Sequence, residues 1–148
     1  EVGYFPEIIL AGRKLNDSMG KYIASEVIKL MIKNSIQIIK SEILILGFSF
    51  KENCPDFRNT KVIDIITELK DYEINLTVVD PLVDSDKVFK EYGLKVLSSV
   101  PEKINFDAAI LAVSHNEFNQ INLNDFVKDK PVFDVKGFYK KSKLIKRL

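Results

Sequence analysis

The sequence predicts an α/β protein with a Rossmann-like, doubly wound, mostly parallel sheet, preceded by a long helix. Two continuous apolar runs, Ile43–Leu46 and Ala108–Val113, are typical of strands that are covered on both faces of a sheet. Segments with helical spacing separate the predicted strands, and this alternation implies right-handed βαβ units. With 148 residues, the chain has room for one domain with a substantial core.

The first predicted element is a helix that begins at Pro6, where a first turn tolerates proline, and ends near Lys33. Its apolar residues recur at three- and four-residue steps and predict one apolar stripe: Leu15, Met19, Tyr22, Ile23, Val27, Leu30 and Met31. A helix of about 27 residues is roughly 40 Å long, which is more than a small domain needs for one packing face. Either the helix lies across its own sheet, or its far part packs on another chain.

A polar break follows at Asn34–Ser41, with room for a short helical continuation through Ile36–Ile39. We place a domain boundary in this break, which divides the chain into residues 1–38 and 39–148. After the first strand, Asn59 or Thr60 is expected to cap the next helix.

The remaining elements alternate between strands and helices. That next helix runs through Val62–Leu69, and a strand follows it at Ile74–Val79. A helix then starts at Ser85 or Asp86 and stops at Gly93, before a weak strand at Lys95–Leu97 and a loop or helical turn at Pro101–Ile104. The last predicted elements are the strand at Ala108–Val113, a turn or helix from His115 to Phe118, a short helical piece near Leu123–Val127 and a last strand at Pro131–Val135. The tail KKSKLIKRL that follows is basic.

Composition argues against several classes of function. The chain has 22 basic and 21 acidic residues and a net charge of +1, which gives no electrostatic reason to expect nucleic-acid binding. No apolar run approaches the roughly 18 residues needed to cross a bilayer, so no membrane partner is expected. The single cysteine, Cys54, excludes an internal disulfide and fits a reducing cytoplasm. The chain begins at Glu1 without a signal peptide, and we expect it to be a fragment of a longer protein.

Candidate ligand-binding residues follow two of the predicted strands. Phe50 and Lys51 leave the sheet at the carboxyl end of the first strand, the edge where open α/β sheets bind ligands. Lys51 is suited to neutralise a phosphate, and Lys136 follows the last strand at the same edge. Arg58 offers a planar fork for a pyrophosphate. The alternatives are a solvated loop lysine for Lys51 and an ion pair with Asp56 or Asp80 for Arg58.

Asp80 ends the second strand, where a Rossmann protein holds a ribose hydroxyl. The first turn reads GFSFKE instead of G-x-G-x-x-G, so the NAD fingerprint is absent and Asp80 is interpreted as a helix cap or a structural partner. Cys54 is interpreted as a loop residue without chemical consequence. His115, the single histidine, could serve as a base or cap a helix, and we expect the structural role because the sequence offers it no neighbouring nucleophile or metal partner. Glu52, Asp56 and Asp80 likewise do not suggest a metal site.

The stretch GFSFKENCPDFRNTKVIDII resembles the signature of the carboxyl-terminal domain of the nucleotide-sugar 6-dehydrogenases, the UDP-glucose/GDP-mannose dehydrogenase family. The likeness continues in VVDP, DAAILAVSHNEF and FDVKGF, and AGRKLNDSMGKYIASEVIKL is similar to the central helix of that family. Nearly the whole chain is covered in the right order. The UDP-N-acetylhexosamine branch of the family is the most similar.

The resemblance implies that residues 39–148 form the UDP-sugar-binding domain and that residues 1–38 end a central helix that makes a homodimer. Phe50 and Lys51 would contact the UDP-sugar, and Lys136 would do so where the family more often has arginine. Arg58 would reach the NAD that an amino-terminal domain holds.

The full enzyme would use two NAD in succession to oxidise the sugar C6 alcohol to a carboxylate for surface polysaccharide. Its catalytic cysteine lies in a glycine-rich segment upstream that this chain lacks, so we expect the fragment alone to be inactive. Two other interpretations stay open. One is a stand-alone nucleotide-binding or regulatory module, and the other is a different two-domain oxidoreductase whose Rossmann-like part binds an unrelated ligand.

Overall fold

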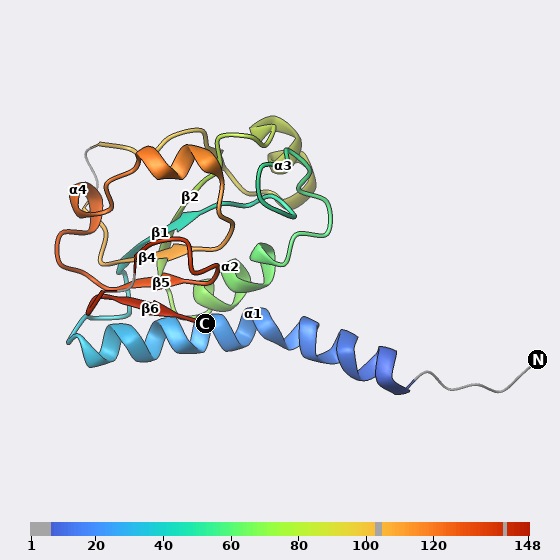
Figure 1. The fold of residues 1–148 in the computed structure, drawn as a ribbon, viewed down its shortest axis with the longest axis horizontal. Coiled ribbons are helices and arrows are strands. Elements are labelled where there is room, and N and C mark those ends of the chain that lie inside the picture. Colours follow the sequence, from blue (N-terminus) through green and yellow to red (C-terminus); the bar gives the residue numbers. More distant parts are fainter. Residues whose placement is uncertain (1–6, 103–104, 141) are drawn as a thin grey trace, which may run out of the picture.

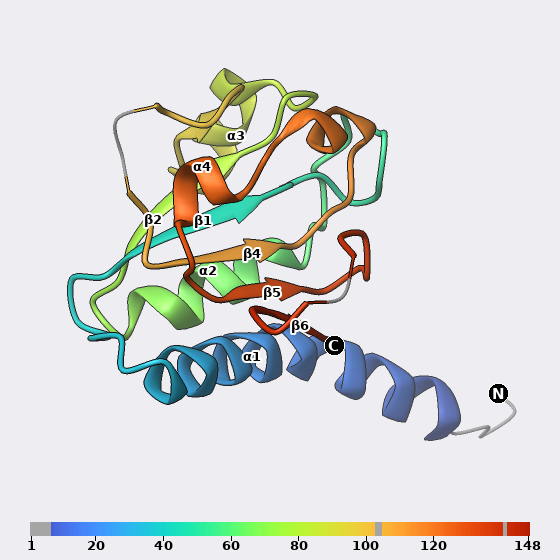
Figure 2. The ribbon, with the colours of Figure 1, turned by 60° about the vertical axis from the view of Figure 1, so that its left-hand side comes forward.

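The described residues form one parallel sheet with helices on both faces (Figures 1 and 2). The structure is a computed structural model that describes residues 7–102, 105–140 and 142–148. The elements in chain order are α1 (Glu7–Lys33), β1 (Glu42–Leu46), α2 (Val62–Lys70), β2 (Asn75–Val79), α3 (Ser85–Tyr92), β3 (Val96–Leu97), β4 (Ala108–Leu111), the 3-10 helix η1 (Asn116–Gln120), α4 (Asn124–Val127), β5 (Val132–Asp134) and β6 (Ile145–Arg147).

The strand order is β3-β2-β1-β4-β5-β6, and every neighbouring pair is parallel. The chain leaves β1 toward β2 on one side and later returns to place β4 on the other side. This reversal is the topological switch point of a doubly wound sheet. The predicted α/β fold with a Rossmann-like parallel sheet is confirmed.

The central strand β1 is buried on both faces, as its continuous apolar run predicts. Ile43 and Ile45 point into the core on the side of α1, α2 and α3, whereas Leu44 and Leu46 point into the core under η1 and α4. Each face of the strand therefore anchors one of the two helical layers.

Helix α1 has two parts with different surroundings. Its carboxyl-terminal part packs on α2 and the sheet and buries Gly20, Ile23, Ala24, Val27, Ile28 and Met31. The helices approach so closely that a Cβ on Gly20 would lie 2.5 Å from the Cβ of Asp64. The amino-terminal part extends past the sheet (Figure 1), and there Ile8 is 87% exposed and Leu15 is 69% exposed. The helix thus lies across its own sheet and also projects beyond it.

Three details differ from the sequence predictions. The stretch 36–39 does not continue the helix: Ser35 adopts a positive φ of 56°, which ends the helical path, and Ile36 and Ile38 pack on the core in an irregular segment. Neither Asn59 nor Thr60 is the cap residue of α2, which begins at Val62, although the Thr60 hydroxyl accepts the Val62 N–H at 3.2 Å. Pro6 and part of the predicted turn at 101–104 lie outside the described residues.

The prediction that Pro131–Val135 is the last strand is wrong, because the basic tail adds β6 in parallel to β5. Charged residues are common on edge strands, and the polar composition of this tail concealed its strand character. Ile145 contributes to the core under α4, while Lys146 forms an ion pair with Glu26 of α1. The tail therefore ties the sheet edge to the long helix.

Within the described ranges, no helix is both long and apolar enough to cross a membrane.

Candidate functional site

Gly47 allows the chain to leave β1 where the site begins. Its φ is +88°, a conformation that residues with a Cβ rarely adopt. A Cβ at this position would lie 2.5 Å from the Cβ of Val113 and 2.6 Å from its carbonyl oxygen. The glycine thus lets the ends of β1 and β4 approach each other and releases the loop 48–53 at the carboxyl edge of the sheet.

Asp80 holds this loop from the end of β2. The residue is 1% exposed. Its oxygens accept hydrogen bonds from the backbone N–H groups of Phe48 (2.7 Å), Ser49 (2.9 Å), Leu82 (2.9 Å) and Val83 (3.3 Å), and one of them contacts the ring of His115 (2.9 Å). Burial alone would raise the pKa of this carboxyl group, but the hydrogen bonds from His115 and the backbone outweigh burial, and the pKa is lowered. Asp80 is therefore an ionised structural partner of the loop.

The same geometry argues against a dinucleotide on this domain. An aspartate that holds a ribose must present a free oxygen at the sheet edge. Both oxygens of Asp80 instead point at protein donors. Together with the missing glycine fingerprint, this shows that the described residues do not fit NAD in the usual Rossmann position.

Asp134 at the end of β5 organises a second loop, and sequence reasoning missed it. It is fully buried, and its oxygens accept from the backbone N–H groups of Lys136 (3.1 Å), Gly137 (2.8 Å) and Tyr139 (2.9 Å). The available signal was an aspartate in an apolar strand directly before Val-Lys-Gly. The loops that carry Phe50 and Lys136 are thus each fixed by a buried aspartate.

A hollow of about 160 Å³ brings these two loops together. It lies at the carboxyl ends of β1, β4 and β5, close to the switch point, and the start of α2 and one face of α1 complete its wall. The residues that line it are Asn16, Met19, Gly20, Ile23, Ser49, Phe50, Thr60, Lys61, Val62, Ile65, Ala112, Val113, Val135 and Lys136. Phe50 and Lys136, which sequence reasoning placed at one sheet edge, line the same hollow. We call it the switch-point pocket.

Helix α1 is held against this pocket by an ion pair at its rim. Lys61 Nζ lies 2.7 Å from Asp17 of α1 and 3.5 Å from Asp64 of α2. The pKa of Lys61 is raised, chiefly by the hydrogen bond to Asp17. The long helix therefore contributes a wall of the candidate site.

The other two predicted residues lie elsewhere. Lys51 is exposed on the loop but does not line the switch-point pocket. Arg58 lines a separate open hollow of about 480 Å³ between its loop and α3, and its guanidinium binds Asp56 through two hydrogen bonds of 2.9 and 2.7 Å. The hydrogen bonds from Arg58 lower the pKa of Asp56 to about 2. Of the two ion-pair partners expected for Arg58, the structure shows Asp56.

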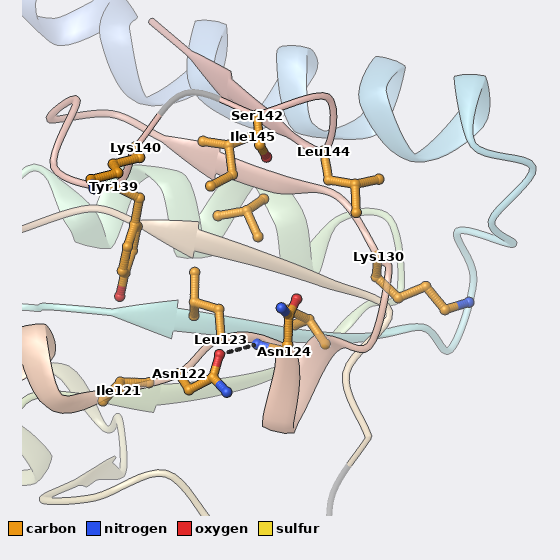
Figure 3. A pocket seen from close by; sticks show the side chains of 12 residues that line it. Ile121, Asn122, Leu123, Asn124, Lys130, Tyr139, Lys140, Ser142, Leu144 and Ile145 are labelled. Atoms are coloured by element: carbon orange, nitrogen blue, oxygen red, sulfur yellow. Dashed lines mark hydrogen bonds between the residues drawn. The ribbon is translucent and has the colours of Figure 1, made fainter.

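A third hollow, of about 280 Å³, lies between α4 and the strands β5 and β6. Figure 3 shows Tyr139 at one end of it, Lys130 at the other end, and Leu123 and Asn124 between them. The hollow faces α4, on the side of the sheet opposite α1, and Val132 and Leu144 place it largely near the amino ends of β5 and β6. Ligands of open parallel sheets bind at the carboxyl edge, so this hollow is not the candidate site.

Removing the Tyr139 hydroxyl is expected to leave the protein at least as stable. This hydroxyl is buried without a hydrogen-bond partner among the described residues, and burial raises its pKa to about 12. We expect Tyr139→Phe to raise the free energy of unfolding by about 1 kcal/mol, because a buried hydroxyl without a partner is desolvated without compensation. Urea unfolding of the variant and the parent would measure the change. A loss of stability would show that the hydroxyl makes a bond in solution.

The fold and the site define an open α/β protein of the Rossmann type with its pocket at the switch point. Comparisons with known proteins identify the family. The profile of the UDP-glucose/GDP-mannose dehydrogenase family, UDP binding domain, matches residues 44–141. This chain belongs to that family, and the matched part is its UDP binding domain.

Individual relatives agree with this assignment. The chain is 50% identical to the UDP-N-acetyl-D-glucosamine 6-dehydrogenase of Salmonella typhi, over 91% of this chain and 32% of that protein. It is 45% identical to protein CapL of Staphylococcus aureus, over 97% of this chain and 34% of that protein. The structure of the UDP-D-ManNAc dehydrogenase from Pyrococcus horikoshii has the same fold, with a TM-score of 0.79 at 18% identity over 99% of this chain and 34% of that one. The chain thus spans about a third of the length of these relatives.

Proposed function

We propose that this chain is the UDP-sugar-binding part of an NAD-dependent nucleotide-sugar 6-dehydrogenase that acts on a UDP-N-acetylhexosamine or UDP-glucose. The observation that carries the proposal is the switch-point pocket, in which Phe50 and the lysine that follows β5 meet beside α1. The family assignment of residues 44–141 supports the same ligand class. The relative from Salmonella typhi is named for UDP-N-acetyl-D-glucosamine, which supports this sugar as the first to test.

In this proposal the domain binds and orients the substrate. The ammonium groups of Lys51 and Lys136 neutralise the diphosphate, and the backbone at Phe50 makes a hydrogen bond to the nucleotide sugar. Buried aspartates hold both loops before the ligand arrives, so little loop ordering remains to oppose binding. A fixed diphosphate then directs the sugar C6 toward chemistry that occurs outside this chain.

The reaction of the longer protein is part of the same proposal. The C6 alcohol is oxidised to a carboxylate, and a cysteine upstream of this chain acts as the nucleophile. Arg58 extends toward NAD held by an amino-terminal domain, and its guanidinium also forms an ion pair with Asp56. The exposed apolar side chains of α1, which include Ile8, Ile9 and Leu15, pack on a second copy and make a homodimer.

Substitution of the pocket lysine is expected to weaken nucleotide binding. In calorimetric titrations of this chain with UDP and GDP, we expect UDP to bind and Lys136→Ala to weaken it about tenfold, because a charge-assisted hydrogen bond to phosphate is lost. Lys51→Ala tests the second lysine in the same way.

Lys95→Ala is the matched control, because this exposed lysine precedes β3 at the opposite edge of the sheet. It should bind UDP as the parent does. UDP binding that neither Lys51→Ala nor Lys136→Ala weakens would contradict the assigned site. Absence of binding by both this chain and the longer protein would favour a module with a different ligand.

A further inference from the structure

His115 is a buried titratable side chain that the proposed binding step does not use. It lies between β4 and η1, and its ring is completely buried. It stands at the cap position of η1 but makes no side-chain cap hydrogen bond there. Its two ring nitrogens instead contact the loop that follows β1, more than sixty residues earlier in the chain.

The two nitrogens hold this loop on both sides of Phe50 and Lys51. Nδ1 accepts the backbone N–H of Asn53 at 2.9 Å. Nε2 lies 3.1 Å from Ser49 Oγ, and that hydroxyl donates to the carbonyl oxygen of Lys51 at 2.9 Å. One imidazole therefore fastens the residue before the Phe50–Lys51 pair and a residue shortly after it.

These contacts define the protonation state that the loop requires. Because Nδ1 accepts from an amide, it carries a lone pair, and the proton is on Nε2, where Asp80 Oδ2 at 2.9 Å and the Ser49 oxygen are its acceptors. A doubly protonated ring would place an N–H against the N–H of Asn53 and break that bond. Among the described residues, the ring contacts Asp80, which follows β2, Ser49 and Asn53 of the loop, and the aromatic ring of Phe118 in η1. Of these groups only Asp80 is charged.

We propose that neutral His115 is a positioning residue that sets the conformation of the Phe50–Lys51 loop and thereby the affinity for the nucleotide sugar. The proposal rests on the proposed function, since it assigns His115 a role in the same binding step. It predicts that removing the His115 contacts weakens binding of the nucleotide sugar by the folded protein. A purely structural histidine would change stability and leave the affinity of the folded protein unchanged.

The test measures binding of UDP-N-acetylglucosamine by calorimetry at neutral pH. We expect a variant that loses the His115 contacts to bind about tenfold more weakly than the parent, which corresponds to the loss of one positioned hydrogen bond.

Two variants separate the contacts. His115→Asn places an amide oxygen near the position of Nδ1, so it keeps an acceptor for the Asn53 N–H and should bind more tightly than His115→Ala. His115→Ala removes both contacts and should bind about tenfold more weakly than the parent at neutral pH. Ser85→Ala is the control, because it removes one half-buried hydrogen bond from Ser85 of α3 to the carbonyl oxygen of Val96 in β3, away from the loop. It should change stability without changing Kd.

The outcomes distinguish the two proposals. If the parent binds the nucleotide sugar and the folded His115 variants bind it equally well, the positioning role is overturned and the proposed function stands. If the parent binds no nucleotide sugar, the proposed function fails and this inference fails with it. If His115→Ala does not fold, His115→Asn decides: it keeps the acceptor for Asn53 but loses the Nε2 contact with Ser49, so it should bind more weakly than the parent. Equal binding overturns the proposal.

Discussion

Replacing Asp80 with asparagine is expected to lower the free energy of unfolding by about 3 kcal/mol, because backbone donors lose a buried anionic acceptor. One oxygen of Asp80 accepts from Phe48 and Ser49, and the other accepts from Leu82 and Val83. Either orientation of the new amide points its NH₂ group at two backbone N–H groups. Chemical unfolding at neutral pH would measure the loss.

The pH dependence provides a second measurement. The pKa of Asp80 is lowered in the folded state, so its stabilising contribution is present above the unfolded pKa of about 3.9 and is lost as the pH falls below that value. The parent should therefore lose more stability than Asp80→Asn between about pH 5 and pH 3. Asp86→Asn is the matched control, because Asp86 is an exposed carboxylate in the first turn of α3. Equal stability of Asp80→Asn and the parent would contradict the proposed role of the carboxylate.

Gly47→Ala is expected to lower the free energy of unfolding by about 4 kcal/mol. The positive φ strains any residue with a Cβ, and the added carbon would meet the backbone of Val113, which cannot move without separating β1 from β4. Unfolding measurements by urea and by heat would test this, with soluble expression as the first indication.

Gly93→Ala separates the two causes. Gly93 also has a positive φ, of +63°, but a Cβ there would have no atom within 4 Å. This control should lose only about 1 to 2 kcal/mol through backbone strain. If both variants lost the same amount, the close approach of β1 and β4 at Gly47 would have no energetic effect.

Elements with strong local signals could be predicted from the sequence. The continuous apolar run of β1 indicated a strand buried on both faces. Helix α3 begins at Ser85, one of the two predicted start residues, and its cap residue is Gly93, the predicted stop. The edge that carries Phe50 and Lys136 could also be predicted, because parallel strands end at a common edge. These signals depend on neighbouring residues or on a general property of the fold.

Features that depend on contacts between distant segments could not be predicted. The strand β6 exists because β5 offers a free edge and Glu26 of α1 pairs with Lys146, and neither is visible in the basic tail itself. Asp134 and His115 gain their roles from backbone N–H groups whose positions depend on the folded loops. A sequence shows which residues can accept a hydrogen bond, but not which donors the fold brings to them.

The sequence alone therefore determined the class of fold, the family and the edge of the sheet that carries the candidate site. The tertiary structure decided that Phe50 and Lys136 share one pocket with α1 while Arg58 lies in another hollow beside Asp56. It also assigned Asp80, Asp134 and His115 as the groups that hold the site loops. The physical reason is range: apolar periodicity and turn chemistry act within a few residues, whereas a buried carboxylate or imidazole is satisfied only by groups that packing places around it.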